Sequence, residues 1–135
     1  MATRTQAHGL TADINRKIAA NYDVEREIVA RDWITQLTGE ELQGPPGMDN
    51  FHLALKDGVI LCKLVNVLQP GSVKKINTNK MVFKQRENIS MFLTACSDIG
   101  VASHSSFQTV DLFEKQNMVQ VLSTLFILSS AVSIK

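Results

Sequence analysis

The spacing of hydrophobic residues along the chain predicts a largely helical protein. The clearest case is residues 24–37, where apolar side chains recur every three or four positions and charged side chains lie mostly opposite. Asp23 can cap the start of this helix, and Gly39 can end it in a left-handed conformation. We expect an apolar stripe to face the core, made of Val24, Ile28, Val29, Trp33, Ile34 and Leu37.

The remaining pattern predicts three more long helices separated by breaks. A Gly-Pro-Pro-Gly segment at 44–47 and the pair Pro70-Gly71 interrupt the periodicity, because proline removes a backbone donor and glycine permits turns. Within the second long helix, Asn66 stands among apolar residues and should bond a neighbouring backbone group. The long helices are expected at residues 24–37, 58–68 and 84–97 and from Asn117 onward. Weaker or shorter pieces are expected at 12–20, 51–55 and 107–114.

The loop between the second and third long helices has no hydrophobic period. It covers residues 71–83, and we expect apolar side chains to anchor it to the core. The predicted anchors are Val73, Ile76, Met81 and Phe83.

These elements predict a compact all-α bundle of four main helices with two or three short ones. The chain of 135 residues fits one domain, and it shows no convincing strand pair and no internal repeat. We place the domain at residues 23–132, after a partly helical N-terminal extension (1–22) and before a short C-terminal end (133–135).

Composition narrows the class of protein further. Hydrophobic residues make up 44% of the chain and charged residues 20%, which excludes a wholly disordered chain. Two cysteines are too few for a disulfide-stapled secreted domain, and the N-terminus has no apolar run typical of a secretory signal. We therefore expect a reducing, cytoplasmic location.

The last helix has to be weighed as a membrane span. Residues 116–134 carry no formal charge, and this length is close to the minimum of about 20 residues for crossing a bilayer. The segment contains many serine, asparagine and glutamine residues, however, which are costly in hydrocarbon. A tail anchor is the alternative; we expect the buried central helix of a soluble domain and no membrane span.

No motif indicates catalysis, a metal or a cofactor. The glycine-rich loops that bind phosphates and the acidic loop that binds calcium are both absent from the sequence. The three histidines are isolated, and Cys62 and Cys96 lie on apolar helical faces, where cysteine acts as a small hydrophobic residue. Trp33 lies on an apolar stripe and is expected to anchor the core. We expect no catalytic residue, no metal and no cofactor.

Charge is distributed unevenly although the net charge is only +1. Residues 58–86 contain six basic side chains and no acidic one. Two interpretations are open: a solvated surface that serves solubility, or a contact for an acidic protein surface or anionic lipid head groups. Nucleic acid is disfavoured, because Phe83 alone supplies an aromatic side chain near the basic residues. The basic residues are Lys63, Lys74, Lys75, Lys80, Lys84 and Arg86.

Three ordered motifs resemble the calponin homology domain, in the single-domain version found at the N-terminus of calponins and transgelins. They are DGVILCKLVNVLQPGSV (57–73), KKINTNKMVFKQRENISMFLTACSDIGV (74–101) and FQTVDLFEKQNMVQVLSTL (107–125). With Trp33-Ile34 in the first helix, the resemblance covers about residues 24–132. It implies a four-helix bundle, an actin-associated cytoskeletal role and no catalysis.

The resemblance also implies where a partner would bind. In paired domains of this family, F-actin contacts involve the first helix and the region of the central motif. The matching basic side chains here are Arg26, Arg31, Lys74, Lys75, Lys80, Lys84 and Arg86. Single domains of this type are weak actin binders, so we expect low affinity, and the acidic residues of the first helix would oppose docking on acidic actin.

The leading hypothesis is thus a monomeric, actin-filament-associated module in the cytoskeleton. The alternative is a signalling adaptor that docks a kinase or another cytoskeletal protein. The chain ends at Lys135, where such a domain would end, and it can be either a minimal member of the family or a fragment of a longer calponin-like protein.

Overall fold

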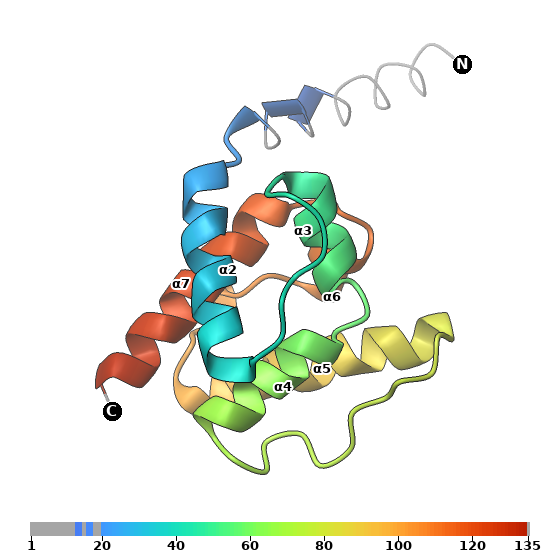
Figure 1. Cartoon of the computed structure of the whole chain (residues 1–135), viewed down its shortest axis with the longest axis vertical. Coiled ribbons are helices and arrows are strands. Elements are labelled where there is room, and N and C mark those ends of the chain that lie inside the picture. Colours follow the sequence, from blue (N-terminus) through green and yellow to red (C-terminus); the bar gives the residue numbers. More distant parts are fainter. Residues whose placement is uncertain (1–12, 15, 18–19, 135) are drawn as a thin grey trace.

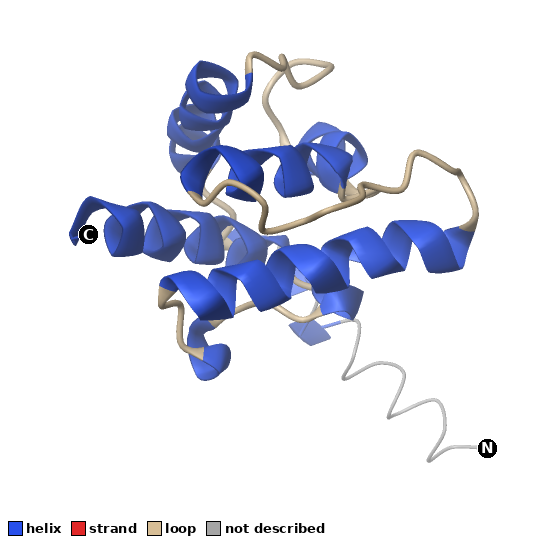
Figure 2. Ribbon diagram, turned by 90° about the horizontal axis from the view of Figure 1, so that it is seen from below, coloured by secondary structure: helices blue, strands red, loops and turns tan. Residues whose placement is uncertain are grey.

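The computed structural model describes residues 13–14, 16–17 and 20–134 (Figure 1). Residues 21–134 contain six α-helices, one short 3-10 helix and no strand, which confirms the predicted all-α bundle (Figure 2). The predicted N-terminal extension (1–22) lies largely outside the described residues, whereas the predicted C-terminal end (133–135) is described up to residue 134, where α7 ends. The helices are α2 (Val24–Thr38), α3 (Met48–Leu55), α4 (Val59–Leu68), α5 (Val82–Ile99), η1 (Ser103–Ser105), α6 (Thr109–Phe113) and α7 (Met118–Ile134).

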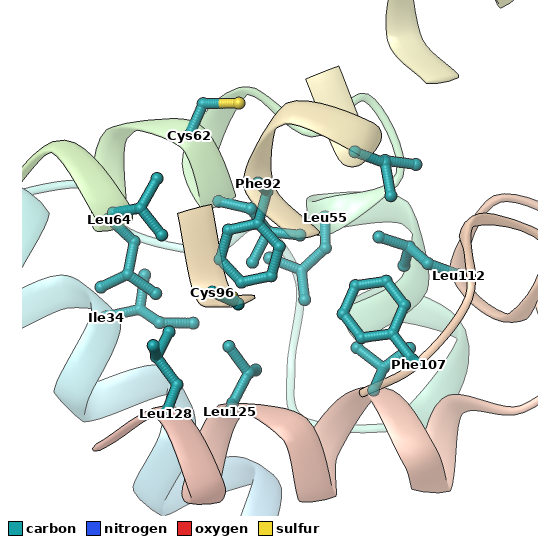
Figure 3. Packing of buried hydrophobic residues seen from close by; sticks show 14 of the residues in the cluster. Ile34, Leu55, Cys62, Leu64, Phe92, Cys96, Phe107, Leu112, Leu125 and Leu128 are labelled. Carbon is teal, nitrogen blue, oxygen red and sulfur yellow. The ribbon is translucent and has the colours of Figure 1, made fainter. Parts of the chain in front are cut away.

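Helix α4 and helix α5 form the centre of the bundle. They pack against each other, while α2 covers α4 and α7, and α3 and α6 close one end. Figure 3 shows Phe92 of α5 in the middle of the core, with side chains from α2, α3, α4 and α7 around it. The ring of Phe92 stacks on that of Phe107, with centroids 6.1 Å apart. The nearly apolar α4 is buried on several sides, as its sequence predicts.

Helix α2 begins and ends as the sequence predicts. The Asp23 carboxylate accepts bonds from the backbone N–H groups of Glu25 and Arg26, and Gly39 adopts φ 75° with its N–H donated to Thr35. The predicted apolar stripe is partly wrong, however. Ile34 is fully buried, but three members of the stripe are between 41% and 55% exposed: Val24, Ile28 and Val29.

These residues are exposed because the face of α2 that packs against the rest of the protein includes a carboxylate. Glu27 is completely buried. It accepts hydrogen bonds from the Tyr22 hydroxyl (2.6 Å), the Arg31 Nε (2.6 Å) and the backbone N–H of Gly47 (3.0 Å). These donors satisfy the carboxylate and fasten the glycine- and proline-rich loop to α2, so that a polar residue takes a core position.

Helix α7 packs its apolar side chains into the core. Met118, Val121, Leu122, Leu125 and Leu128 are all buried there. Within the part of the chain that the structure describes, no helix is both long enough and apolar enough to cross a membrane.

Candidate partner-binding surface

The basic segment predicted from the sequence forms an ordered loop between α4 and α5. We call residues 71–81 the basic loop. Its first part is held by Asn66, whose side chain accepts a bond from the Val73 N–H (2.8 Å) and donates one to the Val73 carbonyl (3.0 Å). This confirms the prediction that Asn66 bonds a backbone group, and it fixes the path of the chain just before Lys74.

The second part of the basic loop is held by the buried side chain of Asn88. The Asn88 Oδ1 accepts from the backbone N–H of Asn77 (2.9 Å), and its Nδ2 donates to the Asn77 carbonyl (2.8 Å) and to the Asp57 carbonyl (2.9 Å). Asn77 in turn donates from its own Nδ2 to the Glu87 carboxylate at 2.7 Å. A single amide therefore ties the basic loop, the start of α4 and the first half of α5 together.

Gly58 allows α4 and α5 to approach at this point. It adopts φ 75°, and a Cβ atom there would lie only 2.6 Å from the Cβ of Asn88 and 3.0 Å from the Ile89 nitrogen. The glycine of the Asp57-Gly58 pair is thus required both by its backbone conformation and by the close contact.

Three lysines of the basic loop extend into solvent. Lys74, Lys75 and Lys80 are exposed, and none of them forms an ion pair with any residue that the structure describes. Lys84, at the start of α5, is engaged locally: its amine lies 3.9 Å from Glu87 and 5.4 Å from the Phe83 ring centroid. The positive end of the α5 helix dipole is directed toward the loop and adds to the charge of these lysines, while Glu87 offsets part of it near Lys84.

Arg86 is oriented differently from the loop lysines. Its guanidinium lies 5.5 Å from the centroid of the Phe113 ring in α6, and the amine of Lys56 lies 4.8 Å from the same centroid. Sequence reasoning missed Lys56, because it follows α3 and nothing in the local pattern connects it with α5.

The two arginines of α2 are not brought to the basic loop. In Figure 1, α2 lies at the left of the molecule and the first turn of α5 at the right. Arg26 stacks on Phe126 of α7, 4.3 Å from the ring centroid. Arg31 is only 11% exposed, because it pairs with Glu27 and donates to the Leu42 and Gly44 carbonyls. These contacts give Arg31 a role in holding the fold, and its part in partner contact stays a prediction.

The predicted anchors of the basic loop divide into two groups. Val73 is buried and Ile76 is partly buried against the core, as expected. Met81 and Phe83 are exposed instead, together with their neighbour Val82. The prediction is wrong for Met81 and Phe83, since Asn77 and Asn88 fasten the loop and these apolar side chains are left on the surface.

The described residues carry no cluster suited to metal binding, and the two cysteines lie in the core. No three histidine, cysteine or acidic side chains come together among them. Cys62 and Cys96 are buried, as predicted, and desolvation raises the pKa of each thiol to about 12. Both cysteines thus remain protonated at neutral pH and belong to the core.

Comparison with known proteins agrees with the all-α fold. The family model of the calponin homology (CH) domain matches residues 24–134. The calponin-homology domain of an IQGAP protein from Schizosaccharomyces pombe is 29% identical, with a TM-score of 0.68, over 92% of this chain and 73% of that chain.

Two further solved structures are similar. The calponin-homology domain of Rng2 from Schizosaccharomyces pombe is 28% identical, with a TM-score of 0.70, over 92% of this chain and 73% of that one. A structure of autoinhibited Vav1 is 28% identical, with a TM-score of 0.67, over 79% of this chain and 22% of that one. The chain belongs to the calponin homology domain family, whose members are generally non-enzymatic and bind actin or other proteins in cytoskeletal and signalling settings.

Proposed function

We propose that this domain is a non-enzymatic, actin-filament-associated module of low intrinsic affinity. The observation that carries the proposal is the basic loop, which presents Lys74, Lys75 and Lys80 to solvent on a backbone held by buried amides. F-actin has an acidic surface, so the charges are complementary. The motifs that resemble calponins and transgelins support the same assignment, including a cytoplasmic location at the cytoskeleton.

The low affinity follows from the charge distribution. Exposed ion pairs each contribute little, about 0.2–1 kcal/mol, and the loop offers only a few of them. Lys84 and Arg86 add charge at the border of the surface, although both already contact aromatic rings of the same chain. Glu25 and Asp32 are exposed on α2 and would repel an acidic filament, so we place Arg26 outside the main contact.

Co-sedimentation with F-actin over a salt series tests this proposal. We expect weak pelleting at low salt that declines as salt increases, because charges are screened over about 8 Å at physiological ionic strength. Absence of pelleting even at low salt would refute actin binding by this domain. Pelleting that does not change with salt would refute the basic loop as the contact.

A second candidate function is an adaptor that docks a kinase or another cytoskeletal protein. It is favoured by an apolar groove of about 300 Å³ between α2 and α7, which no residue of the basic loop lines. Trp33 packs against the core, as predicted, and its side chain also lines this groove. The adaptor function predicts that Val29→Glu abolishes capture of the partner protein and leaves actin pelleting unchanged. The groove is lined by Val29, Ala30, Trp33, Leu125, Phe126, Ser129, Val132 and Ser133.

A further inference from the structure

Three consecutive large apolar side chains are exposed where the basic loop joins α5. Met81 is 52% exposed, Val82 56% and Phe83 57%; we call these residues the apolar tip. Single exposed apolar residues such as Leu53 are ordinary on protein surfaces. Three consecutive ones concentrate exposed apolar surface at one turn of the chain, and concentrated apolar exposure of this kind is typical of interaction sites.

Positive charge flanks the apolar tip along the chain. Lys80 precedes it and Lys84 follows it directly, and Lys74 and Lys75 lie earlier on the same loop. The first acidic residue of α5, Glu87, lies 3.9 Å from the Lys84 amine. No acidic residue occurs from residue 58 to residue 86. A ligand that covers the tip must therefore tolerate or prefer contact with several cations.

The tip is also fixed in place and protrudes. The Asn77–Asn88 bonds hold the loop just before it, and the Asn79 Oδ1 accepts from the Met81 N–H at 2.7 Å. In Figure 1 the first turn of α5, drawn in yellow, extends beyond the other helices at the right of the molecule. Because these bonds already order the turn, it would lose little conformational entropy on binding a partner.

A bilayer with anionic lipids matches all three features. Its acyl boundary accepts protruding apolar side chains to a depth of about 5–10 Å, and its negative surface attracts lysines beside them. An acidic protein surface would satisfy the lysines but would need a matching apolar hollow for the tip. We propose that the apolar tip inserts into anionic membranes while Lys80, Lys84 and the other lysines of the basic loop contact the lipid head groups.

This inference goes beyond actin association and does not rest on it. The two activities share the lysines of the basic loop, so one molecule would engage a membrane or a filament through that surface, and not both at once. Only the membrane contact requires the apolar tip.

Co-sedimentation with sucrose-loaded vesicles tests the proposal. We expect the chain to pellet with vesicles of phosphatidylcholine and phosphatidylserine, and not with phosphatidylcholine alone. The Phe83→Ser variant should bind at least about tenfold more weakly than the unchanged chain, because the aromatic surface buried in the membrane is lost. Each lysine among Lys74, Lys75 and Lys80 changed to glutamine should weaken binding about fivefold. Leu53→Ser, an equally apolar and exposed site outside the tip, is the matched control and should bind like the unchanged chain.

A spectroscopic readout separates insertion from charge attraction alone. In a Trp33→Phe background, Phe83→Trp places the only tryptophan in the tip. Its emission should shift to shorter wavelength with anionic vesicles and should be quenched by brominated acyl chains. Failure of the chain to pellet with anionic vesicles, or binding without change in the Phe83→Ser variant, would overturn the proposal. So would an emission maximum that stays that of a water-exposed tryptophan on bound vesicles.

Discussion

The side chain of Asn88 bonds both backbone polar groups of Asn77, which lies 11 residues earlier in the chain. The amide also reaches the carbonyl of Asp57, so that one buried side chain joins three segments. This relationship explains how a loop without regular secondary structure keeps a defined path, and why its lysines are presented together.

Replacing Asn88 by alanine should therefore destabilise the fold. The change leaves the Asn77 N–H, the Asn77 carbonyl and the Asp57 carbonyl without this partner, and each unsatisfied buried group costs about 1–3 kcal/mol. We expect a loss of about 3 kcal/mol in the free energy of unfolding, measured by urea denaturation. Asn79→Ala removes a single exposed bond and should cost less than about 1 kcal/mol. Equal losses in the two variants would contradict the central role of Asn88.

Gly58 and Gly71 form a matched pair for testing the close approach of α4 and α5. Both have positive φ, 75° and 82°, but a Cβ atom at Gly71 would meet nothing within 4 Å. Gly71→Ala should thus cost only the backbone strain, about 1–2 kcal/mol. Gly58→Ala should cost clearly more, about 3 kcal/mol or above, because the added Cβ also collides with Asn88. Similar melting temperatures for the two variants would exclude the steric part of the argument.

The buried carboxylate of Glu27 should contribute strongly to stability. Glu27→Ala leaves the largely buried Arg31 guanidinium without its ionic partner and removes the acceptor for Tyr22 and Gly47. We expect a loss of about 3–5 kcal/mol, measured by chemical denaturation. Glu25→Ala, two residues earlier and exposed, should change stability by no more than about 0.5 kcal/mol. An equally small effect at Glu27 would show that the buried pair is energetically neutral.

Acidification should destabilise the protein through His52. Burial lowers the pKa of this histidine below its ordinary value of 6.5, and its Nε2 lies 3.2 Å from the Phe113 carbonyl. As the pH falls through about 6.5, the unfolded chain takes up a proton before the folded chain does, so folding stability decreases. Stability measured between about pH 7 and pH 5 should therefore fall less steeply in His52→Gln than in the unchanged chain. The exposed His104→Gln variant serves as control, and identical slopes in all three proteins would contradict this assignment.

Much of the fold could be predicted from sequence because it depends on local signals. The period of apolar residues located α4, α5 and α7 to within a few residues. Asp23 and Gly39 indicated both ends of α2 through their capping chemistry. A solitary amide in an apolar helix predicted the bond from Asn66 to the backbone of the basic loop.

The errors come from contacts between distant residues. Glu27 looked like a surface residue, since nothing near it in the sequence shows that Gly47 supplies a donor from 20 residues away. Arg31 is likewise held by Glu27 and by carbonyls of the distant loop, at Leu42 and Gly44, so that little of it remains on the surface. Likewise, Lys56 and Arg86 both lie over the ring of Phe113 only because α3, α5 and α6 meet in the fold, and no local periodicity can show this. Site residues were therefore predicted from charge and from the family resemblance, without the environment that decides their availability.

If the lysines of the basic loop contact F-actin, reversing their charge should abolish binding. A direct test compares F-actin co-sedimentation of the unchanged chain with that of a Lys74→Glu/Lys75→Glu double variant at low salt. The matched control is Arg26→Glu, which reverses an exposed charge on α2, away from the loop. We expect that the double variant no longer pellets, while Arg26→Glu pellets nearly as well as the unchanged chain. Undiminished pelleting of the double variant would show that these lysines do not contact the filament.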